Sequence, residues 1–204
     1  MNKSFNSILK QHCQEKNNRL CLGLDINPNI SEKNEGERID FIESFAKEII
    51  DATIEHCPIY KPNLAFYEKF GSKGMQALEK IIEHINGRAI TIADGKRGDI
   101  GNTTEQYAVA TFEKMGFDSI TVSPYMGSDS IIPFIKNENK GAFVLCLTSN
   151  QSAQDFQFIK DGDFSLYQRV AQLSVKLNVK NNIGLVVGAT KPDYMHDLVK
   201  CSEG

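Results

Sequence analysis

Short apolar runs alternate with amphipathic stretches along the whole chain, and in the amphipathic stretches the apolar positions recur at helical spacing. The apolar runs are typical of buried strands, and the amphipathic stretches are typical of surface helices. This alternation predicts βα units around a parallel sheet, which is an α/β fold. Six such units can be counted, and no low-complexity tract or linker divides the chain.

The expected elements follow one another without a long break. The expected strands cover residues 20–26, 59–66, 89–93, 119–123, 142–148 and 183–188. The expected helices cover residues 38–54, 75–85, 103–115, 166–177 and 191–199, with a short helix at 131–136. Polar loops are expected at 27–34 and 149–163. Pro62 weakens the second strand, because proline cannot donate a hydrogen bond to a sheet. Asn102 or Thr103 is expected to cap the helix that begins there.

Composition narrows the classes of function. The chain has 204 residues and a net charge of −3, so one domain with a sizeable core is expected, without the basic surface that nucleic acids require. No apolar run reaches the length of a membrane span, and the polar N-terminus does not resemble a secretory signal. The five scattered cysteines favour reduced thiols in a cytoplasmic protein.

The segment IADGKRGDIGNTT, residues 92–104, carries the candidate chemistry. Asp94 and Lys96 are two residues apart at the carboxyl end of the third predicted strand, so their side chains are expected to point the same way, and Asp99 lies just beyond, where the chain turns into a helix. Two carboxylates beside a lysine keep its amine protonated. An arbitrary DxKxxD is more often a salt-bridged turn, but active sites of α/β folds gather at strand ends.

Two other predicted strands carry matching residues. Asp25 ends the first, and Lys61 lies within the second. Alone, each is an ordinary polar residue. With Asp94 and Lys96, they place two acids and two bases on three consecutive strands, which predicts one shared site.

The motif DGKRGDIGNT, residues 94–103, resembles the signature of orotidine 5′-phosphate decarboxylases of the D-x-K-R-G-D-I-G subgroup. GLDINP, KPNLAFYE, TVSPYMG, LTSN and VVGAT follow in the order of that family, so the resemblance covers the whole chain. It implies a (βα)8 TIM barrel that converts orotidine 5′-monophosphate into UMP, the last step of pyrimidine synthesis, without a metal or organic cofactor.

The resemblance also implies roles for individual residues. Lys96 would protonate C6 of the pyrimidine as CO2 leaves, and Asp94 would lie near the departing carboxylate. Lys61 would hold the charge network and contact the ribose, Asp25 would bind a ribose hydroxyl, and Ser149 would read the pyrimidine edge.

A homodimer is implied as well. In the family, the residues that correspond to Asp99, Ile100 and Thr103 reach into the site of the neighbouring subunit. The partners implied are therefore the nucleotide and a second copy of the chain, with no nucleic acid and no membrane.

The chain departs from the family pattern after the sixth βα unit. The seventh strand with its P-G-x-G-A-Q-G-like segment and the eighth with its arginine are not found before Gly204. We expect residues 1–204 to form a single decarboxylase barrel domain that lacks its C-terminal part. We expect a chain with these residues alone to have little activity, because the loops after strands seven and eight of such barrels often hold the substrate phosphate.

Two alternatives remain open. One is a Mg²⁺-dependent phosphosugar lyase or aldolase of the same superfamily, which needs a further acidic ligand near the second strand. Glu68 is the nearby candidate for this ligand, and we expect it to face solvent. The other alternative is an inactive nucleotide-binding fragment.

Overall fold

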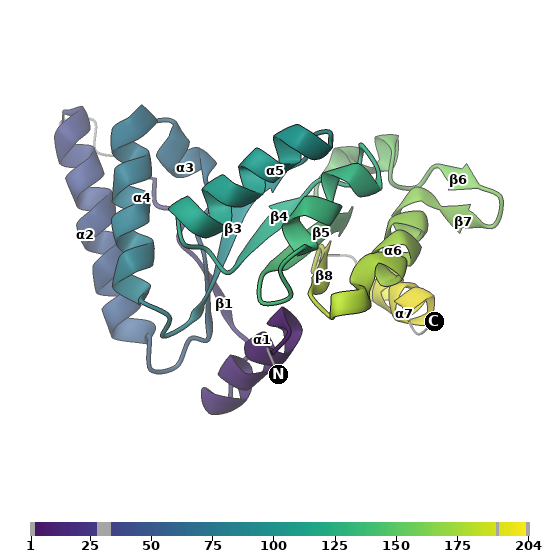
Figure 1. The fold of residues 1–204 in the computed structure, drawn as a ribbon, viewed down its shortest axis with the longest axis horizontal. Coiled ribbons are helices and arrows are strands. Elements are labelled where there is room, and N and C mark those ends of the chain that lie inside the picture. Colours follow the sequence, from purple (N-terminus) through teal and green to yellow (C-terminus); the bar gives the residue numbers. More distant parts are fainter. Residues whose placement is uncertain (1–2, 28–33, 191, 203–204) are drawn as a thin grey trace. The chain divides into compact units, whose positions relative to one another are not determined.

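A computed structural model describes residues 3–27, 34–190 and 192–202, and its α/β order confirms the predicted alternation of strands and helices (Figure 1). The chain divides into two compact units. We call residues 7–95 and 108–120 the N-terminal unit, and the described residues of 1–6, 96–107 and 121–204 the C-terminal unit. Hydrogen bonds order the strands of the main sheet β1-β2-β3-β4-β5-β8, and β6 and β7 form a separate pair.

The N-terminal unit holds the first half of the elements. These are α1 (Phe5–Glu15), β1 (Cys21–Gly23), α2 (Glu35–Thr53), β2 (Ile59–Lys61), α3 (Ala65–Glu68), α4 (Gly71–Ile85) and most of β3 (Ile90–Arg97). β2 pairs in parallel with both β1 and β3. Figure 1 shows α2 and α4 side by side, and their apolar faces supply the buried Ile42, Ile50, Leu78 and Ile81. This apolar layer supports the strands that carry the candidate site.

Local signals in the sequence set the helix ends of this unit. The side chain of Asn34 accepts a hydrogen bond from the backbone N–H of Glu37, whose carboxylate accepts one from the N–H of Asn34, and this capping box starts α2. At the end of α4, Asn86 and Gly87 take positive φ values of 48° and 70°, and this left-handed backbone ends the helix.

The C-terminal unit is built around the later strands. Its elements are β4 (Ser119–Val122, shared with the N-terminal unit), the 3₁₀ turns η2 (Ser128–Ser130) and η3 (Ile132–Ile135), β5 (Gly141–Leu147), η4 (Gln151–Asp155), β6 (Lys160–Asp161), β7 (Phe164–Ser165), α6 (Leu166–Leu177), η5 (Asn178–Lys180), β8 (Ile183–Val187) and α7 (Pro192–Ser202). β5 and β8 pair in parallel, and α6 packs on both strands and on α7. Tyr167 of α6, Tyr194 of α7 and Phe158 meet edge to face at centroid distances of 5.4–5.9 Å.

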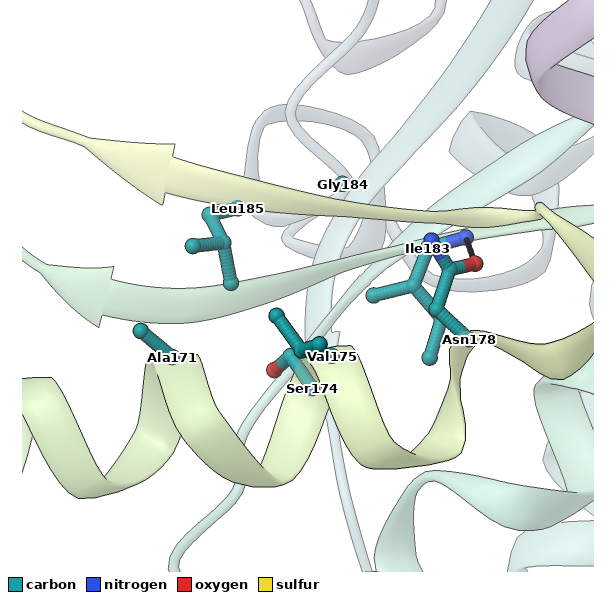
Figure 2. Close-up of a pocket in the computed structure, with 7 residues that line it drawn as sticks. All are labelled: Ala171, Ser174, Val175, Asn178, Ile183, Gly184 and Leu185. Atoms are coloured by element: carbon teal, nitrogen blue, oxygen red, sulfur yellow. Dashed lines mark hydrogen bonds between the residues drawn. The ribbon is translucent and has the colours of Figure 1, made fainter. Parts of the chain in front are cut away.

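A pocket of about 540 Å³ lies between α6 and β8 (Figure 2). Ala171 and Val175 line it from the helix, and Ile183 and Leu185 line it from the strand. At one end the side-chain oxygen of Asn178 accepts a hydrogen bond of 2.9 Å from the N–H of Ile183, which ties the end of the helix to the start of the strand. None of the candidate site residues lines this pocket, so it has no part in the chemistry considered below.

Several predicted boundaries are wrong. Residues 62–66 are not a strand, because beyond Lys61 the pairing with β3 continues as an isolated bridge between Asn63 and Asp94 and the chain then turns into α3. The first strand is shorter than predicted and covers Cys21–Gly23. The third is longer and runs to Arg97, so the strand includes Asp94 and Lys96, whereas Asp99 lies beyond its end. α1 was not predicted, since the polar N-terminal stretch carries few apolar positions.

Other differences concern helices and loops. The third predicted helix, α5 (Gly101–Val109), begins before Asn102, so the predicted caps at Asn102 and Thr103 are wrong, and it ends in a π-helical turn, η1 (Ala110–Lys114). The short helix predicted at 131–136 is the 3₁₀ helix η3, and the loop predicted at 149–163 contains η4 and β6, which pairs with β7. Residues 28–33 of the first predicted loop, and the predicted helix start at Lys191, lie outside the described residues.

Candidate active site

The predicted site residues fall into two groups, one in each unit. In the N-terminal unit, Lys61 ends β2 and Asp94 lies beside it on β3. The Nζ atom of Lys61 donates a hydrogen bond of 3.0 Å to Oδ2 of Asp94, which is 8% exposed. A buried carboxylate is costly without a partner, and Lys61 supplies one. The structure thus brings together one predicted acid and one predicted base.

The charge of Lys61 is stabilised in the fold. Burial opposes its charged form, but the hydrogen bond and charge of Asp94, followed by the charge of Asp25, outweigh burial and raise the pKa of Lys61 above its usual value. Lys61 is therefore a fixed cation at neutral pH, with acidic groups close enough to act on it.

The turn after β2 connects both acids. The backbone N–H of Asn63 donates to Oδ1 of Asp25 at 3.3 Å. The carbonyl of Pro62 accepts a hydrogen bond from the N–H of Asp94, whose carbonyl accepts one from Leu64, at 3.0 and 3.2 Å. Sequence reasoning did not assign this positioning role to Asn63, because it depends on a backbone group and leaves no side-chain signature.

Tyr67 fixes the neighbouring strand end. Its hydroxyl donates a hydrogen bond of 2.8 Å to the carbonyl of Leu24, and both residues are buried. Burial raises the pKa of Tyr67 well above its usual value, so the phenol stays protonated. This contact holds the backbone just before Asp25, which itself is exposed.

The second group lies in the C-terminal unit and begins with Lys96, which is exposed. Its backbone φ is +47°, in the left-handed region that non-glycine residues rarely adopt, at a cost of about 1–2 kcal/mol. Its N–H donates a hydrogen bond of 3.0 Å to the hydroxyl oxygen of Thr121. The expectation that Asp94 and Lys96 point the same way assumed regular strand alternation, and this premise fails at Lys96.

Asp99 is fixed by Thr104, which is fully buried. The hydroxyl of Thr104 accepts a hydrogen bond from the N–H of Asp99 at 3.1 Å and donates one to its carbonyl at 2.5 Å. Gly98 packs tightly beside this turn, because a Cβ atom there would lie 2.9 Å from the carbonyl oxygen of Ser123. A glycine is therefore required for the close approach of the two backbones.

Ile100 and Thr103 are both exposed, and Ile100 is 59% exposed despite its apolar side chain. They lie at the start of α5 next to Asp99. An exposed isoleucine beside polar motif residues leaves this surface free to contact a ligand or another chain.

Ser149 follows β5 and is exposed. It lies against Gly188, where a Cβ atom would approach Ser149 to 2.9 Å. The preceding Thr148 is held by Gln157 through two hydrogen bonds: its N–H donates to Oε1 at 2.8 Å, and its hydroxyl accepts from Nε2 at 2.7 Å. The end of β5 is thus anchored to the loop that follows it.

A pocket of about 550 Å³ lies next to this strand end. Ser123, Thr148 and Gln157 give it polar groups, and its other walls are mainly apolar. Ser149 and Lys96 do not line it. A mixed apolar and polar cavity of this size can hold a small molecule.

Glu68 is the candidate metal ligand of the Mg²⁺-dependent alternative. Glu68 is exposed on α3, as predicted. Among the described residues, no cluster of three or more His, Cys, Asp or Glu is arranged to hold a metal ion. No helix in the described part of the chain combines the length and the apolar character needed to cross a membrane.

Known proteins match this chain over nearly its whole length. The family model described as "Orotidine 5'-phosphate decarboxylase / HUMPS family" matches residues 18–204. An orotidine 5′-phosphate decarboxylase of Christiangramia forsetii is 47% identical over 201 residues, which cover 94% of this chain and 72% of the relative. One of Flavobacterium johnsoniae is 46% identical and is covered to 71%.

Solved structures agree with these matches. The structure of Leishmania donovani OMP decarboxylase aligns with a TM-score of 0.87 and 38% identity, over 98% of this chain and 77% of the other. The fold, the order of the motifs and the sequence identity all indicate the same family. The chain belongs to the orotidine 5′-phosphate decarboxylase / HUMPS family.

Proposed function

We propose that the protein that contains this sequence decarboxylates orotidine 5′-monophosphate to UMP, with Lys96 as the proton donor. Relatives at 46–47% identity are named orotidine 5′-phosphate decarboxylases, and this observation carries the proposal. The ion pair of Lys61 and Asp94 supports it, because the reaction needs fixed charges beside the reacting carbon.

The proposed step breaks the bond between C6 and the carboxylate carbon. CO2 leaves, and the electron pair of that bond stays on C6, in the ring plane, where no adjacent carbonyl delocalises it. The ammonium group of Lys96 stabilises this charge and donates a proton to C6, which forms the C6–H bond of UMP. Lys96 then regains a proton from water. Because the charge exists in the transition state and not in the substrate ring, a fixed ammonium lowers the barrier selectively.

The remaining residues hold the substrate and the charges. Asp94 lies near the departing carboxylate in this scheme, and Lys61 balances its charge and contacts the ribose. Asp25 accepts a hydrogen bond from a ribose hydroxyl, which suits an exposed carboxylate. Ser149 contacts the edge of the pyrimidine, and its hydroxyl can both donate and accept.

A homodimer in the cytoplasm is part of the proposal. Asp99, Ile100 and Thr103 would reach into the site of a second copy of the chain. The exposure of Ile100 and Thr103 and the rigid turn around Asp99 support this arrangement. Burial of Ile100 against a partner would also cover its apolar side chain.

The test is turnover of orotidine 5′-monophosphate by the full-length protein. The ultraviolet absorbance of the pyrimidine should change as UMP forms, and the rate should not change when EDTA is added. Turnover of a hexulose phosphate that stops on addition of EDTA, without release of CO2 from orotidine 5′-monophosphate, would instead support the Mg²⁺-dependent alternative. Binding of UMP without turnover would support the non-catalytic alternative.

A further inference from the structure

The backbone at Lys96 departs from the strand that contains it. Lys96 has a φ of +47° inside β3, although the lysine has a Cβ atom. In this conformation the Cα–Cβ bond leaves the backbone in a different direction from that of an extended strand residue. The direction of the Lys96 side chain therefore depends on what keeps this residue in the left-handed conformation.

Thr121 on β4 is placed to do this. Its hydroxyl oxygen accepts the hydrogen bond from the N–H of Lys96 at 3.0 Å, and the residue is 3% exposed. Threonine is β-branched, so its side chain has few rotamers and its hydroxyl stays where the strand puts it. Two residues further along, the N–H of Ser123 donates to the carbonyl of Arg97 at 2.8 Å. The end of β4 thus holds two successive residues of the motif.

We propose that Thr121 is a positioning residue for Lys96. Its hydroxyl oxygen stabilises the left-handed backbone of Lys96 and so sets the position of the ammonium group. The inference rests on the role proposed for Lys96 and goes beyond it, because Thr121 acts through a backbone hydrogen bond and does not touch the substrate. Without the acceptor, Lys96 can relax to an extended conformation that aims its side chain elsewhere.

The test compares two substitutions in the full-length protein. Thr121→Val keeps the branched shape and removes the acceptor, whereas Thr121→Ser keeps the acceptor. We expect Thr121→Val to lower kcat by roughly 10- to 100-fold, as misplacement of a reacting group does. KM should change by less than about threefold, because ground-state binding is untouched, and Thr121→Ser should keep kcat within about threefold of wild type. Amide hydrogen exchange at Lys96 should be faster in Thr121→Val and not in Thr121→Ser.

A matched control separates positioning from the general loss of a buried hydroxyl. Ser119 lies on the same strand and is fully buried, and its hydroxyl donates to the carbonyl of Thr91 at 3.1 Å. Ser119→Ala should leave kcat unchanged. If Thr121→Val does not fold, Thr121→Ala replaces it with the same expected loss.

Lys96→Ala distinguishes a failure of the positioning role of Thr121 from a failure of the role proposed for Lys96. If Lys96→Ala loses activity while Thr121→Val keeps the wild-type kcat, the positioning role is wrong and the proposed function stands. An equal loss in Thr121→Val and Thr121→Ser would also contradict the role of the hydroxyl. If Lys96→Ala turns over normally, the proposed role of Lys96 as proton donor is wrong, and the positioning role of Thr121 falls with it.

Discussion

Replacement of Asp94 by asparagine tests the ion pair of Lys61 and Asp94 in the candidate site. Nζ of Lys61 lies 3.0 Å from Oδ2 of Asp94, and the side chains are 31% and 10% exposed. At this distance two unit charges attract by about 5–6 kcal/mol if the effective dielectric constant is about 20. The hydration that both charged groups lose on burial offsets most of this attraction. We therefore expect Asp94→Asn to lower the free energy of unfolding by about 1–3 kcal/mol.

The loss should depend on pH with a definite sign. The pKa of Lys61 is raised in the fold, above the value of about 10.4 of an unfolded chain. A raised pKa gives stability that is fully present below the unfolded value and disappears as the pH rises through the folded value. The difference between wild type and Asp94→Asn should be full at pH 8 and shrink above about pH 10.5.

Urea denaturation followed by circular dichroism at pH 8 and in the alkaline range measures both effects. The control is Glu105→Gln, which breaks the exposed pair of Glu105 and Lys136 and should cost less than about 1 kcal/mol. The reasoning is refuted if Asp94→Asn unfolds at the same urea concentration as wild type at pH 8, or if its deficit stays constant as Lys61 loses its proton.

Three further changes test the surrounding scaffold. Gly98→Ala should lower the free energy of unfolding by about 1–3 kcal/mol and reduce turnover, because its Cβ would lie 2.9 Å from the carbonyl oxygen of Ser123. Gly101→Ala, where a Cβ has open space, should leave the melting temperature unchanged, and thermal denaturation of both variants measures the difference. Asn182→Leu should lower the free energy of unfolding in urea by about 2–4 kcal/mol, since the two N–H groups of its buried amide are shared among three backbone carbonyls at 3.0–3.1 Å; an unchanged midpoint would contradict this. Ile100→Asp should shift the protein to a monomer in sedimentation analysis and lower turnover, and a stable dimer would argue against the proposed interface.

The order of strands and helices could be predicted from the sequence because buried strands and amphipathic helices leave different periodicities. The ends of elements could not be predicted as well. Pro62 was correctly seen as a weak point, but the turn into α3 depends on hydrogen bonds to Asp94, which lies on another strand. The extension of β3 to Arg97 likewise depends on contacts with β4, such as that of Thr121 with Lys96.

In the candidate site, too, some features could be predicted from the sequence and others could not. The sequence predicted a shared site of Asp25, Lys61, Asp94 and Lys96, and the structure joins two members of this set, Lys61 and Asp94, in an ion pair. The left-handed backbone of Lys96 could not be expected, because lysine does not favour that conformation and no local signal marks it. Thr121 and Thr104 were missed for a related reason, since buried hydroxyls that bind backbone groups look like ordinary strand and helix residues in a sequence.

The central claim is that Lys96 supplies the proton that replaces CO2 at C6. The most direct test is the rate of conversion of orotidine 5′-monophosphate to UMP by the full-length protein with Lys96→Ala, alongside UMP binding and urea denaturation of the same variant. Lys96 is exposed, so the fold should be retained, and kcat should fall by orders of magnitude while the variant still binds UMP. Near-normal turnover by Lys96→Ala would contradict the mechanism.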